Sequence, residues 1–276
     1  MSFIAKFEEV DRRIVYLLMI IVVVIPLLRP IGLPILTGER SRTFHKVIEA
    51  LPAGSVVWYG VDTGMGGWPE LKAAGISVAQ HLFWRPVKIM FVSFALEGPM
   101  IYELLIRTVS IPPDKKYGTD YVYLGFFAGG ETAIAAVGAD IHKLAKADHY
   151  GTPLTDLPMM KDLESIKDFA LAITVTPATD ILEGYVRQLV APYGAKYAII
   201  CLGVMGPAAE PFYPAQAVGL MVGARVGAEY ELLIGRLGPG LASMDAQSMA
   251  HSLALIFIVL GNLGYFYLRK VKRGAR

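Results

Sequence analysis

Five acidic residues each follow an apolar run and precede a helix-like segment, and they are the residues best suited to chemistry in this chain. Carboxylates gathered in one place bind a cation or a cationic ligand, because hard cations need several oxygen ligands. In a doubly wound α/β sheet, the loops beyond the carboxyl ends of the strands form one crevice. We therefore predict a ligand-binding crevice, with the backbone of Gly129 at its side, formed by Asp62, Glu97, Glu131, Asp180 and Glu210.

A second explanation accounts for each of these acids separately. Asp and Glu favour the first turn of a helix, where they interact with the helix dipole and with free backbone N–H groups. This capping explanation is favoured over a shared crevice, and the crevice stays as the alternative.

Signatures of catalysis are missing from the sequence. Gly64-Met65-Gly66-Gly67 stands where a phosphate-binding loop would stand, but it lacks the G-x-G-x-x-G spacing and a Walker Lys-Ser/Thr pair. No Gly-x-Ser-x-Gly motif occurs, and the only cysteine, Cys201, lies in an apolar run. The histidines show no metal-ligand spacing, since His45, His81 and His251 are scattered. We therefore assign no catalytic residue, leave the metal and the cofactor unknown, and favour a non-enzymatic protein over an enzyme.

The elements that must position these loops alternate between strand and helix. Near-continuous apolar runs separated by helical patterns indicate a parallel sheet covered on both faces. The predicted strands are 55–61, 87–94, 121–127, 169–175 and 197–204. They define a doubly wound, mostly parallel, five-stranded Rossmann-like sheet in an α/β domain at 41–240.

Two apolar segments flank this domain and predict transmembrane helices. Residues 1–13 form an interfacial or cytoplasmic segment, and 14–36 comprise a first transmembrane helix and its exit. Residues 249–268 form the second span and end in an aromatic belt, Tyr265-Phe266-Tyr267. The domain is thus expected to be inserted between two transmembrane helices.

The charge distribution predicts the orientation in the membrane and excludes one class of partner. The basic tail, 269–276, carries five Lys/Arg; subtracting them turns the formal net charge of +2 into −3 for the preceding residues. A mildly acidic body is unsuited to nucleic acid. By the positive-inside rule, the tail is cytoplasmic. We expect a prokaryotic cytoplasmic membrane, both termini in the cytoplasm and the α/β domain outside it.

A row of small residues predicts a packing surface. Read as one helix, 214–234 places Ala215, Gly219, Gly223 and Gly227 four residues apart on one face. Helical glycine is unfavourable unless another backbone approaches closely. We therefore predict a buried helix that contacts the sheet or another subunit.

Three functions follow from these observations. The first is a non-enzymatic structural or assembly subunit that contacts the lipid bilayer and either forms a homo-oligomer or joins other membrane-complex subunits. The alternatives are an extracytoplasmic receptor for a ligand or cation, and a membrane-bound hydrolase or transferase with an unrecognised site.

Overall fold

The computed structural model describes residues 11–274 and divides the chain into two compact units. One unit comprises Met1–Pro34 and Leu237–Arg276, and the other comprises Ile35–Arg236. The second unit is the α/β domain, and all of the predicted loop acids lie within it.

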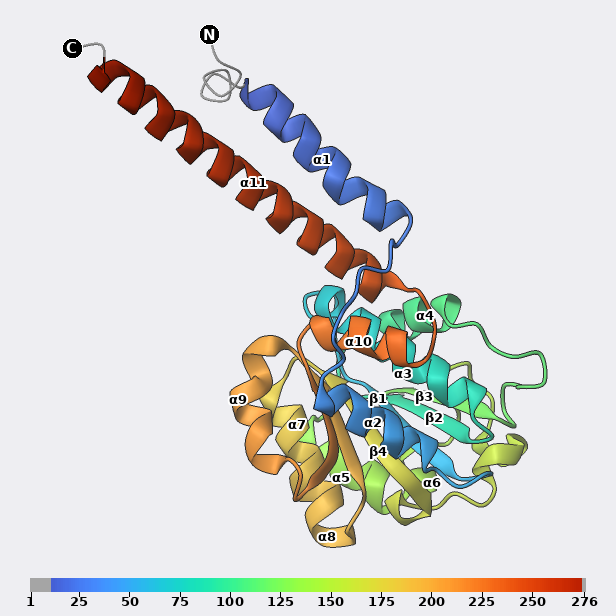
Figure 1. Ribbon diagram of the computed structural model, residues 1–276. Coiled ribbons are helices and arrows are strands. Elements are labelled where there is room, and N and C mark those ends of the chain that lie inside the picture. The colour runs from blue at the N-terminus through green and yellow to red at the C-terminus, as the bar shows by residue number, and fades with distance from the viewer. Residues whose placement is uncertain (1–10, 275–276) are drawn as a thin grey trace. The chain divides into compact units, whose positions relative to one another are not determined.

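The α/β domain is built on a six-stranded, all-parallel sheet (Figure 1). The strands are β1 (Val56–Val61), β2 (Lys88–Ser93), β3 (Tyr121–Phe126), β4 (Phe169–Thr176), β5 (Tyr197–Cys201) and β6 (Ala217–Val222). Their spatial order is β3-β2-β1-β4-β5-β6, the Rossmann-like arrangement, so the direction of winding reverses between β1 and β4. All five predicted strands are confirmed.

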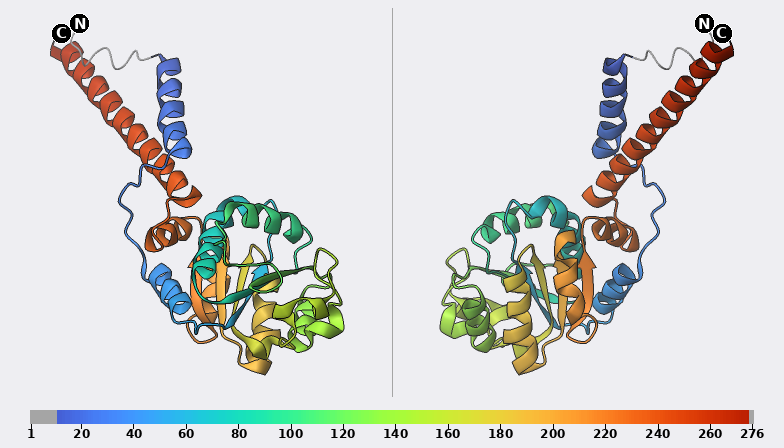
Figure 2. Two further views of the ribbon diagram at one scale, coloured as in Figure 1. Left: turned by 90° about the vertical axis from the view of Figure 1, so that its right-hand side faces the viewer. Right: turned by 90° about the vertical axis from the view of Figure 1, so that its left-hand side faces the viewer.

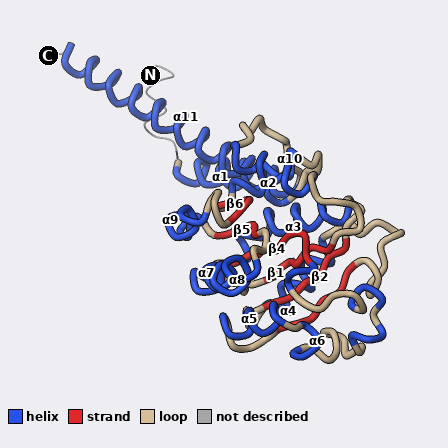
Figure 3. Tube along the Cα trace, turned by 90° about the horizontal axis from the view of Figure 1, so that it is seen from below, coloured by secondary structure: helices blue, strands red, loops and turns tan. Residues whose placement is uncertain are grey.

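Residues alternate between the two faces of the sheet, as the pleat of a strand requires. In β1, Trp58 lies in one hydrophobic core while Val57 and Tyr59 lie in the other. Figure 3 shows the strands as a central layer with helices on both sides. Because both faces are covered, the strands read as continuous apolar runs.

Each face of the sheet is covered by its own helices. One face carries α2 (Glu39–Glu49), α3 (Trp68–Trp84), α4 (Gly98–Thr108) and α10 (Arg225–Leu233). The other carries α5 (Glu131–Ala139), α6 (Ile141–Leu144), α7 (Thr179–Tyr185), the π-helical turn Val186–Val190 and α9 (Gly206–Ala209), with α8 (Ala191–Tyr193) continuing the turn.

Short 3-10 turns complete the chain in this domain. They are Leu154–Asp156, Pro158–Met160, Ile166–Asp168, Gly203–Met205 and Glu210–Phe212. The first two turns bury Leu154 and Met160 in the core beside α5, so this irregular segment is part of the packed domain.

The prediction of a single helix over 214–234 is wrong, and with it the count of five strands. Ala217–Val222 forms β6 at the edge of the sheet, and α10 begins only at Arg225. The apolar run without a polar face fits a buried strand as well as a buried helix, so periodicity could not separate the two. Gly223 has φ +83° and makes the turn between them.

The small residues of that segment therefore do not share one helix face. A Cβ on Gly219 would lie 2.8 Å from the ring of Phe44, so the absence of a side chain here allows α2 to pack closely against β6. A Cβ on Gly227 would lie 2.7 Å from the backbone nitrogen of Ala74, where α10 meets α3. Ala215 lies in an exposed turn before β6. Close packing holds at Gly219 and Gly227, each against a different neighbour within the domain.

The other unit consists of two helices, α1 (Arg12–Leu28) and α11 (Pro239–Gly274), which contact each other (Figure 2). The extended segment after α1 is held by Asp245, whose buried carboxylate accepts hydrogen bonds from the backbone nitrogens of Ile31, Gly32 and Leu33 at 2.7, 2.8 and 2.9 Å. One carboxylate thus satisfies three consecutive N–H groups.

One helix in the described part of the chain, not two, is long and apolar enough to cross a membrane. The candidate span is Pro239–Tyr267, 29 residues within α11, and it starts ten residues before the predicted span. The helix α1 has 17 described residues, fewer than the approximately 20 that a bilayer core of about 30 Å requires. Insertion between two spans therefore stays a prediction, and the segment 1–13 lies mostly outside the described residues.

Candidate functional site

The carboxyl edge of the sheet is where a ligand would bind in this class of fold, at the reversal between β1 and β4. The loop after β1 begins with Asp62 and contains Gly64 and Gly67. Gly67 faces Thr63 and Pro177, the latter from the loop after β4; a Cβ on Gly67 would lie 2.8 Å from the Thr63 hydroxyl. The two loops at the reversal are therefore packed together.

Asp62 lies at the centre of a buried polar network. Its Oδ1 accepts the backbone N–H of Phe94 at 2.8 Å, and its Oδ2 accepts the hydroxyls of Thr174 at 2.8 Å and Tyr185 at 2.9 Å. Burial raises the pKa of Asp62 to about 6, and these hydrogen bonds oppose that rise. A carboxyl group with such a pKa is a candidate for acid–base work, but this one is 1% exposed.

The network continues into the core. Trp58 Nε1 donates to the hydroxyl oxygen of Tyr185 at 3.0 Å. Gly60 leaves the space for both polar groups, because a Cβ there would lie 2.3 Å from Asp62 Oδ2 and 2.3 Å from the Tyr185 oxygen. Every oxygen of the Asp62 carboxylate is thus occupied by the domain itself.

Glu97 closes the loop after β1. Its Oε2 accepts the backbone N–H of Met65 at 2.6 Å, and a Cβ on Gly64 would meet the same oxygen at 2.4 Å. The carboxylate thus holds a neighbouring loop in place. Glu70 has a similar role that the sequence did not reveal, since its Oε1 accepts the backbone N–H of Gly203 at 2.7 Å.

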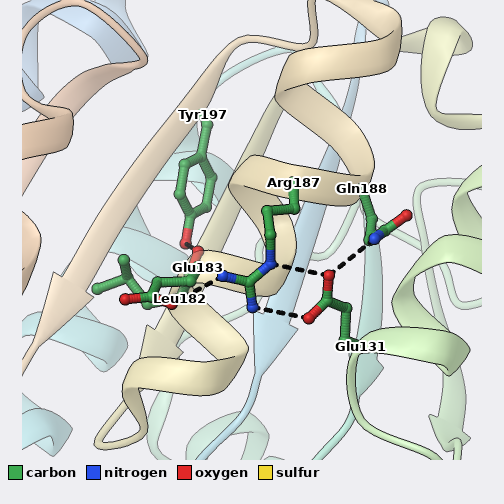
Figure 4. A network of polar contacts seen from close by, with 6 residues as sticks. All are labelled: Glu131, Leu182, Glu183, Arg187, Gln188 and Tyr197. Carbon is green, nitrogen blue, oxygen red and sulfur yellow. Dashed lines mark hydrogen bonds and ion pairs between the residues drawn. The ribbon is translucent and has the colours of Figure 1, made fainter.

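Glu131 belongs to an ion-pair network on the surface (Figure 4). The guanidinium of Arg187 donates to both of its oxygens, at 2.9 and 2.7 Å, and the amide of Gln188 donates at 2.7 Å. These bonds, that of Arg187 foremost, lower the pKa of Glu131 to about 2. Gly129 forms the preceding turn at φ +119°.

The remaining two acids lie apart from these. Glu210 forms a two-fold ion pair with Arg40, one bond of which measures 2.7 Å. Asp180 lies exposed in the first turn of α7. The structure therefore brings Asp62 and Glu97 to neighbouring strands, places Glu131 and Glu210 in separate arginine pairs, and leaves Asp180 at a helix start. Glu97 is the N-cap of α4 without a side-chain capping hydrogen bond, and Glu131 and Asp180 lie in the first turns of α5 and α7. The choice between capping and a shared crevice stays a prediction.

Another cavity lies away from the carboxyl edge. It has a volume of about 480 Å³ and opens at the opposite, amino-terminal edge of the sheet, beside Phe169, Tyr193 and Lys196. Its lining combines apolar side chains with Lys167, Tyr193 and Lys196, and we do not assign chemistry to it.

A second cluster joins residues that the sequence analysis treated as scattered. His45 and Glu49 lie four residues apart on α2, and His81 lies on α3. One ligand atom from each falls within 4.8 Å of the others. The spacing of His45 and Glu49 on a helix was a readable signal, since such residues share one face. Nothing in the sequence indicated that His81 would join them.

Hydrogen bonds order this cluster. His81 Nε2 lies 2.7 Å from Glu49 Oε1, and His81 Nδ1 lies 2.8 Å from the hydroxyl of Tyr230 on α10. Arg85 donates to Glu49 Oε2 at 3.0 Å and to its carbonyl at 2.8 Å. Desolvation lowers the pKa of His81, and the hydrogen bond from His81 lowers the pKa of Glu49.

The fold defines the class of protein: a Rossmann-like α/β domain joined to a helix long enough to span a membrane. Comparison with protein-family models, with curated protein sequences and with solved structures finds no match to this chain.

Proposed function

We propose that the protein is a membrane-anchored, non-enzymatic subunit that self-associates or joins a larger membrane complex through its α/β domain and its transmembrane helices. The observation that carries this proposal is the exposed apolar surface of α11. Leu255, Ile256 and Val259 are each more than half exposed in the middle of the candidate span. Such a surface is stable in lipid or against another helix, and unfavourable in water.

Two polar side chains within the span donate hydrogen bonds to carbonyls of the same helix, which reduces the cost of placing them in lipid. Asn262 Nδ2 donates to the carbonyl of Ile258 at 2.8 Å, and the Ser252 hydroxyl donates to the carbonyl of Ser248 at 2.8 Å. This supports the lipid bilayer as the surroundings of α11.

The carboxyl edge supports a protein contact in preference to a polar ligand. The acids there bond within the domain, as described above. Three large apolar side chains are exposed on the loops after β1 and β2 and on the first turn of α4: Met65 at 48%, Leu96 at 77% and Met100 at 46%. We call these three residues the Leu96 patch and propose it as the surface of the α/β domain that contacts another subunit.

The proposed orientation has both termini in the cytoplasm of a prokaryotic cell and the α/β domain outside the cytoplasmic membrane. Its support is the basic tail, 269–276, which follows the candidate span Pro239–Tyr267. A cysteine at Val204, which is 82% exposed, tests it, because the natural Cys201 is buried and gives the background. In intact cells, a membrane-impermeant maleimide is expected to label Val204→Cys and not the unaltered protein. Labelling only after lysis would place the α/β domain in the cytoplasm and contradict the proposed orientation.

Assembly is tested by the mass of the full chain extracted in mild detergent. We expect a particle larger than one chain, either as a homo-oligomer or with co-purifying membrane proteins. A monomer without a co-purifying protein, at concentrations near those in the membrane, would overturn the assembly function.

A further inference from the structure

We propose that His45, Glu49 and His81 bind a divalent transition-metal ion of the zinc type. The site goes beyond the assembly function and does not depend on it. It lies where α2, α3 and α10 meet on one face of the sheet (Figure 1). Two imidazoles and one carboxylate form a ligand set that suits zinc and leaves a fourth position for water or a ligand.

The three side chains need little movement to reach a metal ion. Around a tetrahedral zinc with bonds of about 2.0–2.1 Å, ligand atoms lie roughly 3.4 Å apart. Here the candidate atoms lie within 4.8 Å of one another. His45 is partly buried and the Glu49 side chain is 44% exposed, so both can adjust. The His81 side chain is only 5% exposed and is therefore held in place. His45 already stacks on His81, with ring centroids 4.7 Å apart.

The surroundings hold the proposed ligands in a suitable orientation. A metal-ligating histidine commonly donates its other N–H to an oxygen, which determines the tautomer. The hydroxyl of Tyr230 stands at that place, 2.8 Å from His81 Nδ1. With the proton on Nδ1, His81 donates to Tyr230 and frees the lone pair of Nε2 for the metal ion. The bond between Nε2 and Glu49 is then replaced by two metal–ligand bonds.

Arg85 holds the far side of the carboxylate. It donates to Glu49 Oε2 and leaves Oε1 to face the two histidines. Glu49 is also the last residue of α2, where the partial negative charge of the helix end disfavours a carboxylate. A cation at Oε1 offsets that repulsion. The site opens into a pocket of about 300 Å³ lined by Trp84, Leu233 and Ile234, which gives an ion access from solvent.

The test uses the full chain, purified in detergent without a polyhistidine tag and stripped with a chelator. Cobalt(II) is the probe, because its visible absorption reports the coordination, and zinc(II) is the competitor. We expect one cobalt ion per chain, displaced by zinc. His45→Gln and Glu49→Gln are each expected to weaken binding more than about 10-fold, and Tyr230→Phe to weaken it roughly 10–100-fold.

His142→Gln is the matched control, because His142 lies on α6 and contacts the carbonyl of Met160 instead of this cluster. It is expected to bind cobalt as the unaltered chain does. His81→Gln is a further variant, but it removes a buried side chain and can fail to fold. In that case His45→Gln decides the outcome, because His45 is the more exposed of the two histidines and its replacement disturbs the fold less. The proposal would be overturned if the unaltered chain failed to bind one ion. It would also be overturned if His45→Gln and Glu49→Gln bound cobalt as tightly as the unaltered chain. Neither result bears on the mass of the assembly.

Discussion

The hydroxyl oxygen of Tyr185 lies 2.9 Å from Oδ2 of Asp62 and 3.0 Å from Nε1 of Trp58, so one phenol links the end of β1 to the aromatic core beneath it. Tyr185 comes from α7, more than a hundred residues later in the chain. Tyr185 therefore satisfies two buried polar groups, and it connects β1 to α7, the helix that follows β4.

Removing that hydroxyl is expected to destabilise the domain. Tyr185→Phe leaves the indole N–H of Trp58 without its acceptor, and a buried unsatisfied donor costs roughly 1–3 kcal/mol. Denaturant unfolding followed by tryptophan fluorescence measures the loss. Tyr193→Phe, at a partly exposed position on α8, is the control and is expected to change stability little. Equal stability of both variants would contradict the role assigned to Tyr185.

The buried Asp62 predicts a pH dependence of stability. Its pKa is raised to about 6 in the folded chain from an ordinary 3.8. The folded state therefore binds this proton more tightly, and the stabilisation is complete below about pH 4 and is lost as pH rises through 6. The amplitude is on the order of 3 kcal/mol, from about two pKa units.

This pH dependence is measured as the difference in unfolding free energy between the unaltered chain and Asp62→Asn from pH 4 to 8. The neutral amide does not titrate, so the decline between pH 4 and 6 is expected to disappear from the variant. Asp114→Asn, at an exposed position, is expected to retain it. A decline of the same size in Asp62→Asn would assign the effect to other groups.

Replacing Gly227 by alanine is expected to disturb the packing between α10 and α3. A Cβ there would lie 2.6 Å from the Cβ of Ala73 and 2.7 Å from the nitrogen of Ala74. Gly227→Ala is therefore expected to separate α10 from α3 and to cost roughly 1–3 kcal/mol. Gly66→Ala is the control, since nothing lies within 4 Å of its added Cβ. Thermal unfolding of the two variants distinguishes a defect of packing from a general effect of alanine.

Replacing Asp245 is expected to loosen the extended segment that follows α1 in the two-helix unit. Asp245→Ala removes the acceptor of three backbone N–H groups, those of Ile31, Gly32 and Leu33. We expect faster proteolysis within 29–36, because this segment loses three hydrogen bonds to a charged group, each of which contributes roughly 1.5–3 kcal/mol. Ser243→Ala, which removes a hydroxyl bonded to the carbonyl of Pro239 on the same helix, is expected to leave the cleavage rate unchanged.

The Leu96 patch predicts a variant that folds but assembles poorly. Leu96→Asp places a charge at a side chain that is 77% exposed, so the domain itself loses little packing. If the patch contacts another subunit, the mass of the detergent particle falls while the unfolding temperature stays the same. Leu144→Asp, 43% exposed on α6, is the control. An unchanged mass in Leu96→Asp would remove the patch from the proposed interface.

Local patterning determined much of this protein. Continuous apolar runs between helical patterns predicted the parallel α/β sheet and five of its strands, because a strand buried on both faces must be apolar throughout. The same rule explains the error at β6. Ala217–Val222 is equally apolar, and its one glycine, Gly219, is as compatible with a row of small residues on a helix as with a strand beneath Phe44.

Only the tertiary structure decided which polar groups meet. The sequence places Asp62, Glu97, Glu131 and Glu210 after strands, but their partners come from distant elements: Tyr185, the N–H of Met65, Arg187 and Arg40. Likewise His45 and Glu49 are neighbours on a helix, whereas His81 reaches them because α3 packs beside α2 and α10. Such pairings depend on the order of strands and the packing of helices, which local periodicity does not encode.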